Sequence, residues 1–155
     1  MLARELVAAG HAVRGTTRDP SRCVEIEAAG AEPAVGDPDV VGTLARSLEH
    51  VGVACVLLGS AVGSPEQLAA LHGSRLDMLL TRMVDTTVRG VVYEAAGSVD
   101  AELLEAGAVL VGARCEDARI PYVLLSADPA DRAIWTAAAA AAVHCALDGG
   151  PAGPR

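Results

Sequence analysis

Side chains that commonly act as acids, bases or nucleophiles are few and widely separated in this sequence. The four histidines are His11, His50, His72 and His144, and none forms an H-x-x-x-H pair or stands beside a cysteine at metal-ligand spacing. A structural role is the simpler interpretation of each. The G-x-S-x-G motif of serine hydrolases is absent. We therefore expect neither a metal site nor a serine hydrolase.

Chemistry that depends on lysine is excluded, because all 12 basic residues are arginines. Such a chain cannot form a lysine Schiff base, a P-loop or a Tyr–Lys catalytic pair. Neither Tyr93 nor Tyr122 has a lysine four positions later. Tyr93 ends an apolar run beside Glu94, where its hydroxyl could donate a hydrogen bond to a ligand. The alternative is that Tyr93 is a packed strand residue.

The spacing of apolar residues predicts a regular alternation of helices and strands. Strands are expected over 12–17, 32–35, 53–58, 88–93 and 121–125, and helices over 1–10, 19–30, 39–48, 64–83, 100–115 and from 128 into the alanine tract 137–142. The predicted helix starts are Asp19, Asp39, a capping box at Ser64–Gln67, Asp100 and Asp128. Gly73 is expected to interrupt the long helix 64–83.

Five strands separated by helices imply parallel pairing through right-handed crossovers. The continuous apolar run 53–58 is typical of a strand that is buried on both faces. We predict an α/β fold with an open parallel sheet and helices on both of its faces. It would form one domain over residues 1–148, followed by a disordered Gly/Pro-rich tail over 149–155.

Composition excludes several classes of partner. The chain has 155 residues and a formal net charge of −8, which argues against nucleic acid and against anionic membrane surfaces. No apolar stretch is long enough for a membrane span, and no signal peptide is recognisable.

The four scattered cysteines, without a C-x-x-C pair, indicate reduced thiols and a cytoplasmic protein.

Several segments resemble, in the same order, the extended and atypical short-chain dehydrogenase/reductases, which include NAD-dependent epimerases and NmrA-like NAD(P)H-binding proteins. They are GHAVRGTTRDP at 10–20, GD at 36–37, VLLGSA at 56–61, VVY at 91–93 and IPYVLL at 120–125. The resemblance covers most of the chain and implies a Rossmann-like fold. It also implies a nicotinamide dinucleotide as cofactor.

The resemblance implies specific cofactor contacts. Arg18 corresponds to the residue that contacts the 2′-phosphate of NADP, because a guanidinium matches a phosphate; NAD is the alternative cofactor. Asp37 would bind the adenine amino group, or else cap a helix, a role that Asp39 could also fill. Gly59, Ser60 and Ala61 would let ribose or nicotinamide approach the backbone, or else serve tight packing. The family's Tyr-x-x-x-Lys signature is missing, because no lysine can lower the pKa of a tyrosine, and this departure argues against the usual reductase mechanism.

The family's first strand and its glycine-rich turn would precede residue 1, so the sequence looks like a member that lacks them. No G-x-G-x-x-G occurs, and the glycine-rich 59–64 has the wrong spacing. In the usual order 3-2-1-4-5-6 the first strand lies between the second and the fourth. The strand 12–17 would then either pair directly with 53–58, or both would keep open edges.

Three functions are compatible with these observations. The first is an NAD(P)-dependent oxidoreductase or epimerase-like enzyme that acts on an unknown small molecule. The second is a non-catalytic NADP-sensing, NmrA-like regulator, which the missing Tyr–Lys pair favours. The third is a remnant of the fold that acts through protein contacts, including a homodimer formed at an open sheet edge.

Overall fold

The structure, a computed structural model, describes residues 1–150 and has the expected alternation of helices and strands. The strands are β1 (Arg14–Thr17), β2 (Glu32–Val35), β3 (Val53–Val56), β4 (Gly90–Glu94) and β5 (Tyr122–Leu125). The α-helices are α1 (Leu2–Ala8), α2 (Cys23–Glu27), α3 (Pro65–Ala70), α4 (Leu76–Val84), α5 (Ala101–Ala118) and α6 (Arg132–Leu147). Two 3₁₀ segments, Pro20–Arg22 and Val41–Leu48, and a π-helical turn, Leu71–Arg75, complete the list.

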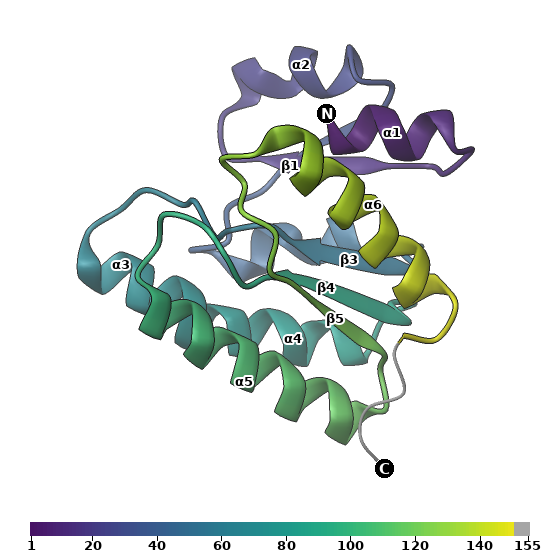
Figure 1. The fold of residues 1–155 in the computed structure, drawn as a ribbon. Coiled ribbons are helices and arrows are strands. Elements are labelled where there is room, and N and C mark those ends of the chain that lie inside the picture. Colours follow the sequence, from purple (N-terminus) through teal and green to yellow (C-terminus); the bar gives the residue numbers. More distant parts are fainter. Residues whose placement is uncertain (151–155) are drawn as a thin grey trace.

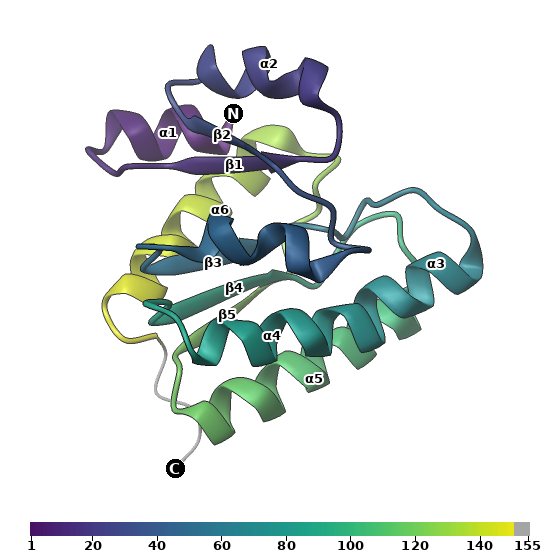
Figure 2. The ribbon, with the colours of Figure 1, turned by 180° about the vertical axis from the view of Figure 1, so that it is seen from behind.

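All strand pairs are parallel, as predicted, but they form two sheets instead of one. β1 pairs only with β2, and β4 lies between β3 and β5. β1 and β3 are not hydrogen-bonded to each other, and both views of the ribbon keep them apart (Figures 1 and 2). Of the two expected arrangements, the structure therefore has the open edges. Alternate backbone groups of β1 and β3 point away from their only partners.

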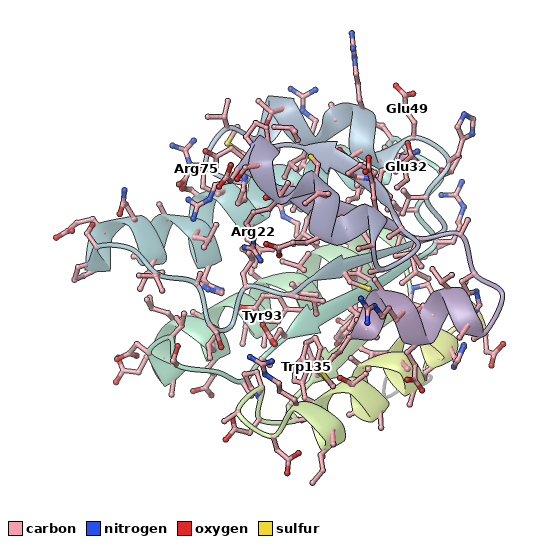
Figure 3. All side chains as sticks on the ribbon, turned by 90° about the horizontal axis from the view of Figure 1, so that it is seen from above. Arg22, Glu32, Glu49, Arg75, Tyr93 and Trp135 are labelled. Atoms are coloured by element: carbon pink, nitrogen blue, oxygen red, sulfur yellow. The ribbon has the colours of Figure 1, made fainter. Side chains whose placement is uncertain are left out.

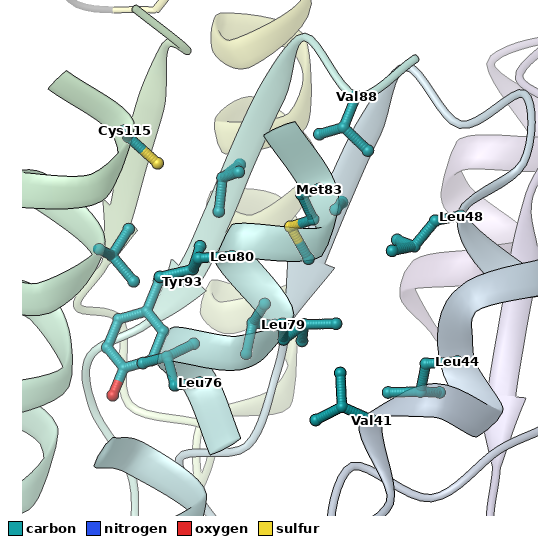
Figure 4. Packing of buried hydrophobic residues seen from close by; sticks show 14 residues of the cluster. Val41, Leu44, Leu48, Leu76, Leu79, Leu80, Met83, Val88, Tyr93 and Cys115 are labelled. Atoms are coloured by element: carbon teal, nitrogen blue, oxygen red, sulfur yellow. The ribbon is translucent and has the colours of Figure 1, made fainter. Parts of the chain in front are cut away.

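Helices cover both faces of the three-stranded sheet, as predicted. Residues of a strand alternate between faces, so Val91 and Tyr93 face one way and Val92 the other. The first face packs against α4, α5 and the 3₁₀ segment 41–48 through the cluster shown in Figure 4. The second packs against α6, and Leu6 of α1 joins this cluster. The contact between α1 and α6 helps to hold the two-stranded sheet beside the larger one.

Local sequence signals determine most helix starts. Asp19 accepts a hydrogen bond from the Ser21 amide, and Asp100 accepts one from Glu102. The capping box at Ser64 and Gln67 forms as predicted. These side chains satisfy amide groups that have no partner within the first turn of a helix.

Two predicted helix starts are wrong. The last helix begins at Arg132, because Asp131 accepts the bond from the Ile134 amide, while Asp128 only holds a turn through Ala130. Residues 41–48 form a 3₁₀ segment without a side-chain cap, so Asp39 does not cap a helix. The carboxylate of Asp39 instead faces a guanidinium at the end of β1.

The α-helix is interrupted around Gly73, as predicted, because α3 ends at Ala70 and α4 begins at Leu76. The helical run continues from α3 into α4 through the π-helical turn Leu71–Arg75. A π-turn inserts an extra residue per turn and rotates the side chains that follow, and such turns are frequent at functional sites.

The predicted disordered tail begins with two ordered glycines. Gly150 donates a hydrogen bond to the Cys145 carbonyl and has a positive φ of 73°, which closes the end of α6. Residues 151–155 lie outside the described part of the chain. Among the helices of residues 1–150, none combines the length and the apolar character that crossing a bilayer requires.

Candidate functional site

The carboxyl ends of the strands point to the side of the molecule where α3 lies (Figure 1). In open parallel sheets ligands bind at this edge, because the loops that follow the strands form a crevice there. The residues proposed as cofactor contacts, Arg18, Asp37 and Gly59–Ala61, all follow strands at this edge. The site is therefore described strand by strand.

Arg18 directly follows β1 and extends into solvent. Its side chain is 58% exposed, and its nearest acidic partner, Asp39, is 3.8 Å away. At this distance the contact is a weak surface ion pair that leaves most of the guanidinium fork free. Arg18 is consequently available to a phosphate group.

Asp37 follows β2 and shapes the turn beside Arg18. Its carboxylate accepts a hydrogen bond from the Asp39 amide at 2.9 Å, and its own amide donates to the Thr43 hydroxyl at 2.8 Å. Asp37 thus stabilises a turn instead of capping a helix. One of its carboxylate oxygens has no hydrogen bond to another described residue and can accept one from a ligand.

Gly59 follows β3 and is closely packed against the loop after β4. Its amide donates to Glu94 Oε2 at 2.7 Å, and its carbonyl accepts from the Val99 amide at 2.9 Å. A Cβ atom at this position would collide with the Ala96 carbonyl. The sequence left two roles open for Gly59, close approach of a ligand and tight packing. The structure shows that its small size serves the packing of the loop after β4. Ser60 is exposed, and Ala61 is half-buried in the turn that follows.

The side chain of Tyr93, near the end of β4, points into the core. This side chain is fully buried, and its hydroxyl lies 2.8 Å from Nδ1 of His72. Burial, with a smaller contribution from the Glu94 charge, raises the pKa of Tyr93 to about 12. Tyr93 was interpreted either as a hydrogen-bond donor to a ligand or as a packed strand residue. Its surroundings support the packed residue, because the hydroxyl is buried away from solvent.

His72 lies in the π-helical turn and is also buried. Burial lowers its pKa, and the nearby Leu58 carbonyl opposes this effect only in part. Its Nε2 lacks a partner with hydrogen-bond geometry among the described residues. The neutral imidazole thus joins the helix to β4 through Tyr93.

Glu94 is a buried carboxyl group that the sequence analysis passed over. It ends β4 on the face opposite Tyr93, with only 4% of its surface exposed. One oxygen accepts from the Gly59 amide and the other from the Trp135 indole at 2.8 Å. Burial raises its pKa, while these two bonds act in the opposite direction. A charged residue that ends an apolar strand was the available signal, because such a position is rarely charged without a partner.

A second missed residue is Arg75, at the end of the π-helical turn. Together with Pro38 and Leu58 it lines a narrow crevice between the loops after β2 and β3. Its Nε is buried and has no hydrogen-bond partner within residues 1–150. Figure 3 places Arg75 and Arg22 toward the strand ends, and Glu32 and Glu49 toward the opposite side. Arg22 is already bonded to Glu25 at 3.1 Å, so Arg75 is the cation that remains available to an anion here.

An open hollow of about 550 Å³ lies beside the ends of β4 and β5. Its lining includes the loop residues Ala95–Gly97, one face of the first turns of α5, and Asp128. The lining begins at Ala95, the residue after Glu94, and consists mainly of small apolar residues. The hollow is large enough to hold part of a small organic ligand.

The comparisons with known proteins identify the fold. No family model and no curated protein matches the sequence. Among solved structures, the triphenylmethane reductase of Citrobacter sp. in complex with NADP(H) matches with a TM-score of 0.60 and 15% identity. Vestitone reductase from alfalfa matches equally, with a TM-score of 0.60 and 15% identity. The chain has the Rossmann-like fold of these reductases.

A third structure, that of the protein gox2253, matches with a TM-score of 0.65 and 20% identity. Each match covers 81% of this chain but only 44%, 51% and 46%, respectively, of the three known structures. The chain thus spans about half the length of these structures. The resemblance seen in the sequence is confirmed at the level of the fold.

Proposed function

We propose that this chain provides the dinucleotide-binding part of an NAD(P)-dependent reductase-like protein, with NADP(H) as the preferred cofactor. The observation that carries the proposal is Arg18, an exposed guanidinium at the end of β1 with only a loose acidic partner. A 2′-phosphate would replace that weak contact by charge-assisted hydrogen bonds. The fold shared with a reductase that binds NADP(H) supports the same assignment.

The residues at the strand ends fit such a cofactor unevenly. Arg18 suits the 2′-phosphate, the free oxygen of Asp37 suits the adenine amino group, and Arg75 adds a buried, unpartnered donor next to Pro38. Gly59 fits less well, because Ala96 occupies the space in front of it. Ser60 and Ala61 border the same edge and remain proposed contacts. When bound, the nicotinamide would supply hydride transfer.

Binding is tested by titrating NADPH and NADH into the protein and following nicotinamide fluorescence. Arg18→Ala is expected to weaken NADPH binding about 10- to 100-fold, the value of one or two charge-assisted hydrogen bonds, and to change NADH binding little. Arg46→Ala is the matched control, since Arg46 is exposed and its side chain bonds to no other described residue. Equal losses for the two cofactors would contradict the 2′-phosphate assignment.

A sensing role without turnover is the second candidate, and the burial of Tyr93 favours it. No lysine is present, and the tyrosine hydroxyl is committed to His72 in the core. A sensor would bind NADPH and leave it unoxidised in the presence of a panel of carbonyl compounds and dyes. An enzyme would oxidise the cofactor with at least one of them. If NADPH does not bind at millimolar concentration, the third hypothesis, a protein that acts through protein contacts, is the one that stands.

A further inference from the structure

Two histidines from opposite ends of the chain meet on the surface. His11 lies in the turn between α1 and β1, and His144 lies in the last turn of α6, 133 residues away. Their Nε2 atoms are 3.0 Å apart, the ring centroids are 5.1 Å apart, and the ring planes are inclined by 42°. His144 is exposed and His11 is half-buried, so solvent and ions can reach the pair.

The pair has no other hydrogen-bonding function. Within residues 1–150, neither side chain contacts another donor or acceptor at hydrogen-bond distance. One neutral imidazole can donate to the other, which explains the contact in the absence of an ion. Both Nε2 lone pairs become available together when the donor ring carries its proton on Nδ1 instead of Nε2.

The separation of the two nitrogens suits one class of ion. With a metal–nitrogen distance of about 2.05 Å, a 3.0 Å separation corresponds to an N–metal–N angle of about 94°. Tetrahedral coordination, with an angle of about 109°, would need roughly 3.35 Å at the same bond length. An angle close to a right angle is that of neighbouring ligands in square-planar or octahedral coordination, which Ni²⁺ and Cu²⁺ adopt with imidazole.

We propose that His11 and His144 form a surface site for a divalent transition metal of the nickel and copper class. The exposed His144 ring turns slightly, so that both lone pairs point to one ion while the nitrogens keep their separation. No third His, Cys, Asp or Glu from the described residues completes the set, so water fills the remaining positions. The position suits a cation, because the C-terminal end of a helix such as α6 carries partial negative charge.

The ion would join the two parts of the fold. His11 leads into β1 of the two-stranded sheet, whereas α6 packs on the three-stranded sheet. β1 and β3 share no hydrogen bonds, so contacts between α1 and α6 are among those that hold the parts together. An ion that binds only the folded arrangement stabilises that arrangement by mass action.

The test is calorimetric titration of the whole chain with NiCl₂ in a non-coordinating buffer. Ni²⁺ is preferred to Cu²⁺ as the probe, because Cu²⁺ can oxidise free thiols, of which the described residues have four. One ion is expected per chain, and Ni²⁺ is expected to raise the thermal unfolding midpoint. His11→Ala and His144→Ala should each weaken binding by more than about tenfold and abolish that shift, because loss even of an outer-shell partner costs 10–100-fold.

His50→Asn is the matched control, since His50 is exposed but remote in sequence from both ligands and has a positive φ that asparagine tolerates. It should bind Ni²⁺ like the unaltered protein, and Mg²⁺, which prefers oxygen ligands, should not bind at the site. Thermal unfolding without metal establishes that each variant is folded. Absence of saturable binding at millimolar Ni²⁺, or binding that either alanine variant retains unchanged, overturns the proposal.

Discussion

The indole nitrogen of Trp135 donates a 2.8 Å hydrogen bond to the buried carboxylate of Glu94. This bond connects the end of β4 to the first turns of α6, and the other carboxylate oxygen holds the Gly59 amide after β3. One side chain therefore joins three segments at the edge where the proposed cofactor would bind. The arrangement of that edge depends on the charge state of Glu94.

The first prediction concerns the pH dependence that Glu94 contributes. Burial raises its pKa above the ordinary 4.5, so above pH 4.5 the unfolded chain ionises this group before the folded protein does. The folded state then binds more protons, and its stability falls as the pH rises through this window. Glu94→Gln removes the ionisation. As the pH rises above 4.5, its free energy of unfolding should therefore increase relative to that of the unaltered protein.

Urea unfolding at several pH values measures this difference. Glu105→Gln serves as the control, because Glu105 is exposed and ends no strand. If the difference between Glu94→Gln and the unaltered protein shrinks as the pH rises, the ionised carboxylate is the stabilising form. That result would contradict the dominant effect of burial.

The second prediction concerns the close packing at Gly59. A methyl group there meets the Ala96 carbonyl, which is backbone and cannot move without displacing the loop after β4. Gly59→Ala should lower the free energy of unfolding by about 1–3 kcal/mol, the usual cost of overpacking. At Gly52 an added methyl meets nothing within 4 Å, so Gly52→Ala should cost far less. Equal costs in denaturant unfolding would show that the collision is not the cause.

The third prediction separates a structural from a catalytic role of Tyr93. Tyr93→Phe leaves Nδ1 of buried His72 without its partner, which should cost about 1–3 kcal/mol of stability. Because the hydroxyl is remote from solvent, NADPH affinity should not change. Unfolding curves and NADPH titrations of the same variant test both statements. Loss of NADPH binding in a correctly folded variant would place Tyr93 at the cofactor after all.

The fourth prediction concerns the open edges of β1 and β3. Edges without a partner strand tend to pair with other chains, so the protein is expected to self-associate as its concentration rises. Thr16 is exposed within β1. The amides of Glu32 and Gly36, near the two ends of β2, bond to the carbonyls of Val13 and Thr17 and not to Thr16. Thr16→Lys should therefore reduce association without disturbing the β1–β2 pairing. Sedimentation velocity at several concentrations would detect it; an unchanged distribution would mean that this edge is not the contact.

Local sequence patterns predicted the strands and most helix starts because these depend on near neighbours. The capping box at Ser64 and the cap at Asp100 involve residues two or three positions apart. Errors arose where equivalent residues compete, as Asp128 and Asp131 do for the start of α6. The interruption of the helix 64–83 near Gly73 was predicted, but its π-helical form was not, since a single extra residue does not disturb the apolar spacing enough to be recognised.

By itself, the sequence determined the parallel α/β architecture, the absence of lysine from this chain and the position of Arg18 at a strand end. Apolar periodicity and residue type can be recognised in the chain without knowledge of its fold. Only the tertiary structure decided that Tyr93 is buried against His72, that Glu94 meets Trp135, and that His11 meets His144. The physical reason is that these contacts join residues 21 to 133 positions apart, and the packing of whole helices and sheets brings them together.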